Sequence, residues 1–185
     1  MRSENVLVLL SGGVDSAACL SFYVNLSYAT KALFVDFGQP SRINELKAAQ
    51  KISAYYDVPF HTITVKGYKS ISKGFIKGRN LFLLSAALMA HSEKTGLISL
   101  GIHAGTSYSD CTPNFMDKAQ SVLDIYEGGK VLFAAPFAKW SKNDIWEYCK
   151  NMEVPVKYTY SCELGLKQPC GKCLSCRDLK KLYAG

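Results

Sequence analysis

The N-terminal part of the chain reads Val6-Leu7-Val8-Leu9-Leu10-Ser11-Gly12-Gly13-Val14-Asp15-Ser16, an apolar run that leads directly into a glycine pair. The apolar run is typical of a buried strand, and the residues after it have the pattern of a helix. The two glycines let the backbone between them turn sharply and approach a ligand closely. Backbone N–H groups at the start of the helix favour an anion there. We therefore predict that residues 11–16, the phosphate loop, bind a phosphate group.

Asp15 is the unusual residue of the phosphate loop, because a carboxylate repels a phosphate unless a cation lies between them. A Mg²⁺ ion that bridges Asp15 and the phosphates resolves this conflict. Ser11 and Ser16 add hydroxyl donors. The loop lacks the Gly-Lys-Ser/Thr of a Walker A loop and is therefore of another kind. The alternative is a tight strand-to-helix turn that binds no ligand.

Short apolar segments alternate with helix-length segments along most of the chain. Strands are expected at residues 6–10, 32–36, 60–65, 97–102 and 131–135. Helices are expected at residues 16–26, 42–56, 80–94, 113–126 and 142–152. The strands are continuously apolar, which is typical of strands buried on both faces. The alternation predicts a doubly wound α/β fold with a five-stranded parallel sheet and with ligands at the carboxyl ends of the strands.

The composition is that of a soluble globular protein, with 48% apolar and 20% charged residues in a chain of 185. No apolar stretch approaches the roughly 20 residues of a membrane helix. The run at residues 6–10 is too short for the apolar region of a signal peptide and leads into glycines. We therefore expect a cytoplasmic protein without a membrane partner.

The net charge of +7 is unevenly distributed along the chain. No acidic residue lies between Asp57 and Glu93, and this window holds the basic residues Lys66, Lys69, Lys73, Lys77 and Arg79. The window fits either a solvated basic loop or a field that attracts phosphates or an anionic substrate. No helix-turn-helix or RNP-type pattern supports nucleic acid as the partner.

Four of the seven cysteines lie near the C-terminus: Cys162, Cys170, Cys173 and Cys176. In a protein without a secretory signal, such a cluster indicates a metal rather than disulfides. Four thiolates fit a closed tetrahedral zinc site, and an iron–sulfur cluster is the alternative. Predicted strands are absent from Pro155 onward. We therefore predict a nucleotide-binding domain of residues 1–154 and a small zinc-binding appendage of residues 155–185, the cysteine tail, packed on it.

The string Ser-Gly-Gly-Val-Asp-Ser at residues 11–16 resembles the PP-loop signature of the ATP pyrophosphatase superfamily. Members of this superfamily split ATP into AMP and pyrophosphate, usually by adenylating a carbonyl or carboxylate oxygen. Further segments resemble those of one family, the 7-cyano-7-deazaguanine synthases of the queuosine pathway. They are Asp36-Phe37-Gly38-Gln39 with Glu45, Gly78-Arg79-Asn80, Tyr108-Ser109-Asp110-Cys111 with Phe115, and Thr159-Tyr160-Ser161-Cys162 followed by Pro169-Cys170-Gly171-Lys172-Cys173-Leu174-Ser175-Cys176. The resemblance spans essentially the whole chain.

The resemblance implies an ATP-dependent carbon–nitrogen ligase with ATP, Mg²⁺ and Zn²⁺ as cofactors. Enzymes of this family adenylate the carboxylate of 7-carboxy-7-deazaguanine, let ammonia form the amide, and dehydrate that amide to the nitrile with a second ATP. The expected partners are therefore the deazaguanine acid and ammonia. A homodimer is compatible with a single small sheet, although no residue pattern demands one.

The resemblance also assigns roles to individual residues. The implied catalytic residues are Asp15, Ser16 and Lys142. The implied ATP-binding residues are Leu10, Ser11, Gly12, Gly13, Val14, Asp15, Ser16, Phe37, Gln39, Arg79 and Asn80. The implied substrate-binding residues are Tyr108, Asp110, Cys111 and Phe115. The implied zinc ligands are the four cysteines of the tail.

Three departures from the family pattern affect the substrate half of the site. Pro40-Ser41-Arg42 follows Gln39 where the family has a histidine and basic residues, and Glu45 comes one residue late. The segment before Gly78 is shorter than usual, and the acidic residue of the family ahead of the Tyr108 element is missing.

These departures leave the acceptor of the adenylated carboxylate open. One alternative joins the deazaguanine to a protein amine, since relatives of this family are known in anti-phage operons. A second is a tRNA-thiolating enzyme with Cys111 as the catalytic residue. A third is a non-catalytic nucleotide-binding subunit.

Overall fold

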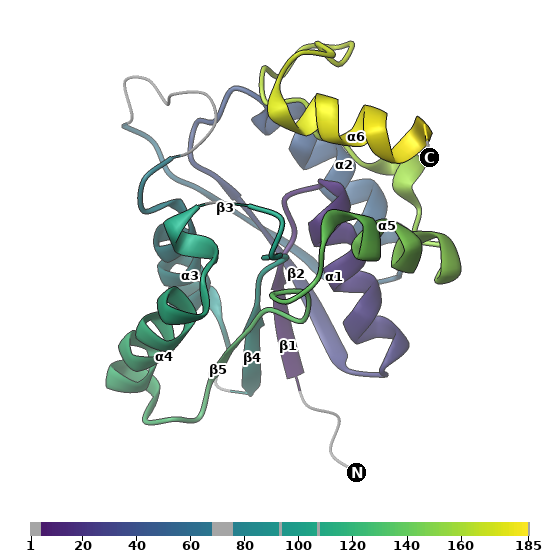
Figure 1. The fold of residues 1–185 in the computed structure, drawn as a ribbon. Coiled ribbons are helices and arrows are strands. Elements are labelled where there is room, and N and C mark those ends of the chain that lie inside the picture. The colour runs from purple at the N-terminus through teal and green to yellow at the C-terminus, as the bar shows by residue number, and fades with distance from the viewer. Residues whose placement is uncertain (1–4, 68–75, 93, 107, 185) are drawn as a thin grey trace.

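The computed structural model describes residues 5–67, 76–92, 94–106 and 108–184. Its sheet consists of β1 (Asn5–Leu9), β2 (Ala29–Asp36), β3 (Phe60–Thr64), β4 (Thr95–Ser99) and β5 (Leu132–Ala134). All neighbouring strands pair in parallel in the order β3-β2-β1-β4-β5 (Figure 1). The predicted five-stranded parallel sheet is therefore confirmed. The strand order reverses between β1 and β4, which is where folds of this kind bind ligands.

Helices cover both faces of the sheet. Five follow the strands in turn: α1 (Val14–Asn25), α2 (Arg42–Tyr55), α3 (Arg79–Ala90), α4 (Pro113–Glu127) and α5 (Lys142–Asn151). Helices α3 and α4 lie on one face, and α1, α2 and α5 lie on the other (Figure 1). Two short 3₁₀ turns, Ser109–Cys111 and Val156–Tyr158, lie in the connections.

Strand β1 shows why the predicted strands are continuously apolar. Val6 and Val8 are buried in the core that includes α1 and α5, whereas Leu7 and Leu9 are buried in the core that includes α3. Alternate side chains of a strand point to opposite faces, so a central strand with helices on both sides has no solvent-facing residues.

The expectation that all strands are buried on both faces is wrong for the two edge strands. In β3, His61 and Thr62 are exposed, and in β5 Leu132 is 51% exposed. Each edge strand has a neighbouring strand on one side only, so its side chains are less completely covered than those of β1. The ladder of β4 also ends at Ser99, three residues before the predicted end at residue 102.

The cysteine tail contains a helix that the sequence analysis did not predict, α6 (Leu174–Ala184). Leu179 and Leu182 of this helix pack against the core that holds α1 and α5. The ring of Tyr183 lies edge-on to Trp146 of α5, with 4.8 Å between the ring centroids. The tail therefore packs on the rest of the chain through an apolar face of α6 (Figure 1).

Helix α5 begins with a capping box that fixes the start of the helix beside the phosphate loop. Ser141 Oγ accepts from the backbone N–H of Asp144 at 3.2 Å, and Asp144 Oδ2 accepts from the backbone N–H of Ser141 at 2.8 Å. Replacing Ser141 by alanine is expected to lower the free energy of unfolding by about 1 kcal/mol. Urea unfolding followed by circular dichroism measures this loss. Ser121→Ala, in the exposed middle of α4, serves as the matched control and should leave the midpoint almost unchanged.

Candidate nucleotide site and four-cysteine centre

The phosphate loop joins β1 to α1 in a conformation that requires glycine at its second position. Gly12 has φ +82°, and a Cβ atom on it would stand 2.4 Å from the backbone oxygen of Glu45 on α2. Ser16 Oγ donates to the backbone oxygen of Gly13 at 3.0 Å, and Ser11 Oγ donates to Ser16 Oγ at 3.1 Å. The loop thus presents backbone N–H groups and two hydroxyls at the N-terminus of a buried helix, an arrangement that suits an anion.

Asp15 lies between two nitrogen-bearing side chains at the carboxyl end of the sheet. Lys142 Nζ, at the start of α5, lies 2.5 Å from Asp15 Oδ1 and also contacts Oδ2. His103 Nε2, beyond the end of β4, lies 3.8 Å from Asp15 Oδ2. The predicted catalytic residues Asp15 and Lys142 are therefore in direct contact, although they stand 127 residues apart in the chain.

His103 belongs to this cluster, although the sequence analysis gave it no role. The backbone N–H of Gly105 donates to His103 Nδ1 at 3.0 Å, which leaves the proton of the neutral ring on Nε2, facing Asp15. Burial lowers the pKa of His103, and the Lys142 charge also lowers it, while Asp15 opposes them. The ring is thus an uncharged N–H donor near neutral pH. Its place after a strand on the ligand-binding edge was the one sequence signal for it.

The second predicted nucleotide element follows β2, and its side chains are turned inward. Gln39 Oε1 accepts from the backbone N–H of Phe37 at 3.0 Å, and Gln39 Nε2 donates to Glu45 Oε2 at 3.0 Å. Ser41 Oγ donates to Glu45 Oε1 at 2.7 Å. The Phe37 ring packs edge-on against Phe82 of α3, 5.9 Å between centroids. Phe37 and Gln39 therefore hold the loop after β2 in shape.

Burial raises the pKa of the Glu45 carboxyl at the centre of this network, and hydrogen bonds from Gln39 and Ser41 oppose the shift. Two other predicted nucleotide residues, Leu10 and Val14, are buried in the core that contains α1. Because their side chains are packed there, only their backbone atoms are left to make the contact with a nucleotide that the resemblance implies, and that contact stays a prediction.

At the start of α3, two predicted ATP-binding residues lie against two predicted substrate-binding residues. The first pair is Arg79 and Asn80, and the second pair is Asp110 and Cys111. Asp110 is buried, and its Oδ2 accepts from the backbone N–H of Asn80 at 3.3 Å. Asn80 Nδ2 donates to the backbone oxygen of Asp110 at 2.9 Å and lies 3.6 Å from Cys111 Sγ. Arg79 Nε donates to Asn80 Oδ1 at 3.3 Å. Asp110 therefore caps α3 from a distant segment and joins the two halves of the candidate site.

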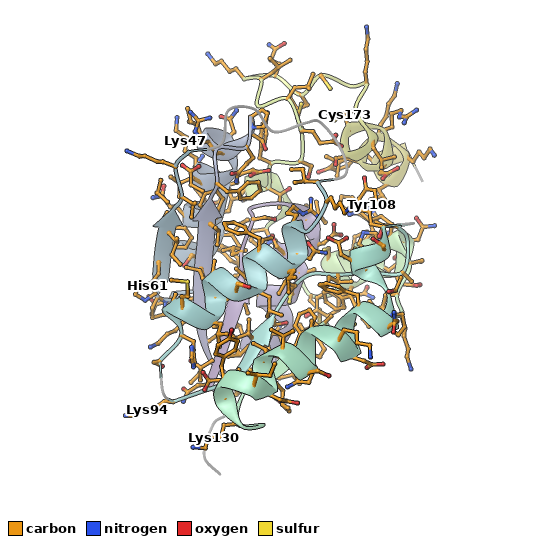
Figure 2. The ribbon with its side chains drawn as sticks, turned by 90° about the vertical axis from the view of Figure 1, so that its left-hand side faces the viewer. Lys47, His61, Lys94, Tyr108, Lys130 and Cys173 are labelled. Carbon is orange, nitrogen blue, oxygen red and sulfur yellow. The ribbon has the colours of Figure 1, made fainter. Side chains whose placement is uncertain are left out.

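Two predicted substrate-binding residues, Phe115 and Tyr108, lie apart from the contacts between Asn80 and Asp110. Phe115 packs edge-on against Phe133 of β5, 6.3 Å between centroids, and so lies between α4 and the sheet. Tyr108 lies at the end of the molecule toward which the strands point, as Cys173 does, whereas Lys94 and Lys130 lie at the opposite end (Figure 2).

The window without acidic residues between Asp57 and Glu93 is described only in part. Its residues Lys66 and Lys77 are exposed, and Lys69 and Lys73 lie outside the described residues.

The four cysteines of the tail come together as the sequence predicts. Their Sγ atoms all lie within 4.8 Å of one another, and those of Cys170 and Cys176 are 3.9 Å apart. A single ion with four metal–sulfur bonds of about 2.3 Å in a tetrahedron needs sulfur atoms about 3.8 Å apart, so the arrangement fits one metal ion. An iron–sulfur cube between the four cysteines would hold them further apart.

Backbone N–H groups support the negative charge that a metal ligand needs. Those of Lys172 and Cys173 donate to Cys170 Sγ at 3.4 and 3.3 Å, and that of Cys170 donates to Cys162 Sγ at 3.3 Å. The N–H groups of Cys173 and Lys172 lower the pKa of Cys170 to about 6. Cys170 is thus prepared to offer a thiolate at neutral pH. Burial instead raises the pKa of Cys176 to about 12.

Comparison with known proteins places the chain in a family. The family model described as "Queuosine biosynthesis protein QueC" matches residues 5–74 and 64–184. The chain belongs to the QueC family. A QueC relative, the 7-cyano-7-deazaguanine synthase of Aquifex aeolicus (strain VF5), is 31% identical over 219 residues, which cover 100% of this chain and 98% of the relative. Another, from Synechococcus sp. (strain CC9311), is 29% identical and covers 100% of this chain and 96% of the relative. The predicted family and the predicted class, an ATP-dependent ligase, are confirmed.

Solved structures of other proteins share the fold of this QueC chain. The U34-tRNA thiolase NcsA from Methanococcus maripaludis has a TM-score of 0.58 and 18% identity, covering 100% of this chain and 65% of that one. The NMN synthetase from Francisella tularensis has a TM-score of 0.53 and 18% identity, covering 98% and 83%. At these identities the likeness concerns the fold alone. None of the helices in the described part of the chain has the length and apolar character to cross a membrane.

Proposed function

We propose that this chain is a 7-cyano-7-deazaguanine synthase, which uses ATP to activate the carboxylate of 7-carboxy-7-deazaguanine. The observation that carries the proposal is the full-length match to the QueC family, in a structure where the phosphate loop, the Asp15–Lys142 pair and the Asn80–Asp110 pair meet at one end of the sheet. A carboxylate is a poor electrophile, and conversion to an acyl-adenylate supplies a good leaving group.

The reaction begins when a substrate carboxylate oxygen attacks the α-phosphorus of ATP and the bond to pyrophosphate breaks. Ammonia then attacks the acyl carbon, AMP leaves, and a proton is lost to give the amide. The amide oxygen then attacks the α-phosphorus of a second ATP, the bond to pyrophosphate breaks, and the amide nitrogen loses a proton. Loss of AMP and of the remaining N–H proton gives the nitrile. In this scheme the phosphate loop binds the departing pyrophosphate, and Lys142 offsets the negative charge that develops on it.

Asp15 is assigned two tasks in this proposal. Its carboxylate holds Lys142 in place through both oxygens, as the contacts in the nucleotide-free chain support. With ATP bound, the same carboxylate is suited to Mg²⁺, a hard cation that prefers oxygen ligands and usually binds together with substrate phosphates. The ion would supply positive charge to the pyrophosphate leaving group.

The substrate is assigned to the other side of the cluster, beside Tyr108, Asp110 and Cys111. Asp110 Oδ2 accepts from the backbone N–H of Asn80. The other carboxylate oxygen, Oδ1, has a long contact of 4.0 Å from Cys111 Sγ and is the proposed acceptor for N–H groups on the deazaguanine ring. Cys111 Sγ lies 3.6 Å from Asn80 Nδ2, and the proposal assigns it to the wall of the substrate site rather than to nucleophilic attack. Phe115 supports this wall through its contact with Phe133.

Zinc is the proposed metal of the cysteine tail. Four thiolates around one ion leave no open coordination position, so the site is structural rather than catalytic. The close sulfur–sulfur distances favour one ion over an iron–sulfur cluster and so speak against a tRNA-thiolating enzyme that carries such a cluster. The comparisons give no support to a role in anti-phage defence.

The decisive experiment incubates the protein with Mg²⁺, ATP and 7-carboxy-7-deazaguanine, with and without ammonia, and follows pyrophosphate and the deazaguanine product by mass spectrometry. We expect pyrophosphate release only when the acid is present, and amide or nitrile only when ammonia is present. Release that does not depend on the acid would contradict the proposed substrate. An acid-dependent adenylate that ammonia leaves unchanged would point instead to a protein amine as the acceptor.

A further inference from the structure

The cysteine tail touches the phosphate loop directly. The backbone N–H of Tyr160 donates to the backbone oxygen of Gly12 at 2.9 Å. At Gly13, the position that a Cβ atom would occupy lies 3.9 Å from the Tyr160 backbone oxygen and 4.0 Å from Ser161 Oγ. Residues 160 and 161 therefore pass beside both glycines of the loop, close to the place assigned to the ATP phosphates.

The same part of the tail is fixed to the loop that follows β2. A Cβ atom on Gly165, which has φ +67°, would stand 2.1 Å from the backbone oxygen of Pro40, so the two backbones are in close contact. Asn44 Nδ2 of α2 donates to the Gly165 backbone oxygen at 3.0 Å. Tyr160 OH donates to the backbone oxygen of Leu166 at 2.7 Å and closes the segment on itself. Residues 160–166 thus bridge the two loops of the candidate nucleotide site.

The four-cysteine centre holds the other side of this bridge. Cys162 comes two residues after Tyr160, and its Sγ accepts from the backbone N–H of Cys170. Glu163 Oε1 accepts from the backbone N–H of Ser175 at 3.1 Å and from Ser175 Oγ at 3.0 Å, which ties the bridge to the start of α6. A metal ion on the four thiolates would make these contacts one rigid unit, since each ligand restrains the others.

Within residues 5–67, 76–92, 94–106 and 108–184, the Ser161 hydroxyl makes no hydrogen bond to another residue. It lies beside the phosphate loop, to which Ser11 and Ser16 already contribute hydroxyls. A hydroxyl that donates to a phosphate oxygen makes a charge-assisted hydrogen bond, stronger than one between neutral groups.

We propose that Ser161 is a further phosphate-binding residue and that the metal-loaded cysteine tail places it at the phosphate loop, so that zinc and ATP bind cooperatively. This inference rests on the proposed function, because it takes ATP to be the ligand of the loop. The coupling is reciprocal: if zinc strengthens ATP binding by a given factor, ATP strengthens zinc binding by the same factor.

The first test measures ATP affinity by calorimetry on full-length protein that carries one zinc per chain. The probe is an ATP analogue with a methylene group between the α- and β-phosphates, with Mg²⁺. We expect Ser161→Ala to weaken binding about tenfold, as for a lost hydrogen bond to a charged group. Ser121→Ala, on the exposed face of α4, is the matched control. Equal affinities of Ser161→Ala and the wild type would overturn the role of Ser161.

The second test addresses the coupling without removing a metal ligand. Asn44→Ala cuts the tie between α2 and the bridge and leaves all four cysteines in place. We expect it to keep one zinc per chain and to bind the ATP analogue about fivefold more weakly than the wild type. In the wild type, the analogue should raise the affinity for zinc, measured by equilibrium competition with a chelator, by a similar factor, and Asn44→Ala should reduce that gain. A zinc affinity unaffected by the analogue would overturn the coupling.

These outcomes can be separated from a failure of the proposed reaction. Zinc-dependent binding of the analogue by a protein that forms no deazaguanine product would remove the substrate assignment and leave the coupling standing. Normal product formation by a protein whose binding of the analogue does not depend on zinc would remove the coupling and leave the substrate assignment standing. A zinc-loaded wild type that does not bind the analogue would overturn both.

Discussion

Asp15→Asn is expected to lower the rate of acid-dependent pyrophosphate release by about 10²- to 10³-fold, which is the size of the loss when one preorganised hydrogen-bond donor is removed from other active sites. The substitution keeps the size of the side chain and removes its charge. Lys142 Nζ then loses the carboxylate that holds it through both oxygens, and Mg²⁺ loses its proposed protein ligand. A continuous assay for pyrophosphate at saturating ATP measures the loss.

Two further measurements make the Asp15 prediction specific. Asp117→Asn, on the exposed face of α4, makes the same change of charge far from the loop and should leave the rate unaltered. If Asp15 holds Mg²⁺, the Mg²⁺ concentration for half-maximal rate should also rise in Asp15→Asn. A variant that retains the wild-type rate and the wild-type Mg²⁺ dependence would refute both tasks assigned to Asp15.

Gly12→Ala is expected to have the largest effect on stability, with a loss of about 3 kcal/mol or more in the free energy of unfolding. Two costs add. A left-handed backbone is unfavourable for alanine by about 1–2 kcal/mol, and forcing a methyl group into a packed site costs about 1–3 kcal/mol. The new Cβ would stand 2.4 Å from the Glu45 backbone oxygen and 3.0 Å from Ala48 Cβ. Because α2 would have to move, binding of ATP should also be lost.

Gly38 provides the matched control for this prediction. It has φ +83°, almost the value at Gly12, but no atom lies within 4 Å of the position of its missing Cβ. Gly38→Ala therefore reports the backbone cost alone, about 1–2 kcal/mol. Urea unfolding of the two variants separates the cost of the left-handed backbone from the cost of the contact between the new methyl group and α2. Equal losses in both would show that the contact between Gly12 and α2 does not contribute.

The fold could be predicted from the sequence because its signals are local. Each strand is a short apolar run, and each helix after it has its own pattern, so the alternation alone identifies a parallel α/β sheet. Which strand lies at an edge is a property of the tertiary structure, and for this reason the exposure of His61 on β3 and of Leu132 on β5 was missed. Helix α6 was not predicted because few apolar residues, such as Leu179 and Leu182, mark its buried face, and a pattern this short does not by itself indicate a helix.

The candidate site could be predicted as a set of residues but not as a set of contacts. The four cysteines are close in the chain, and their spacing alone indicates that they meet. Asn80 and Asp110 were assigned to different ligands, yet they bond to each other, because the N-terminus of α3 has no cap within its own segment. Gln39 likewise bonds to Glu45 inside the protein. No local pattern reports contacts between such distant segments.

The place of β1 in the sheet has a consequence for the way the chain is made. Asn5 pairs with Ala29 on one side and with Thr95 on the other. On the ribosome, one edge of this apolar strand therefore has no partner until β4 has been synthesised, and β5 and α5 follow later still. Non-local parallel pairing folds slowly, and unpaired strand edges are prone to associate with other chains. The nascent chain, rather than the finished enzyme, is thus the form of this protein most exposed to aggregation.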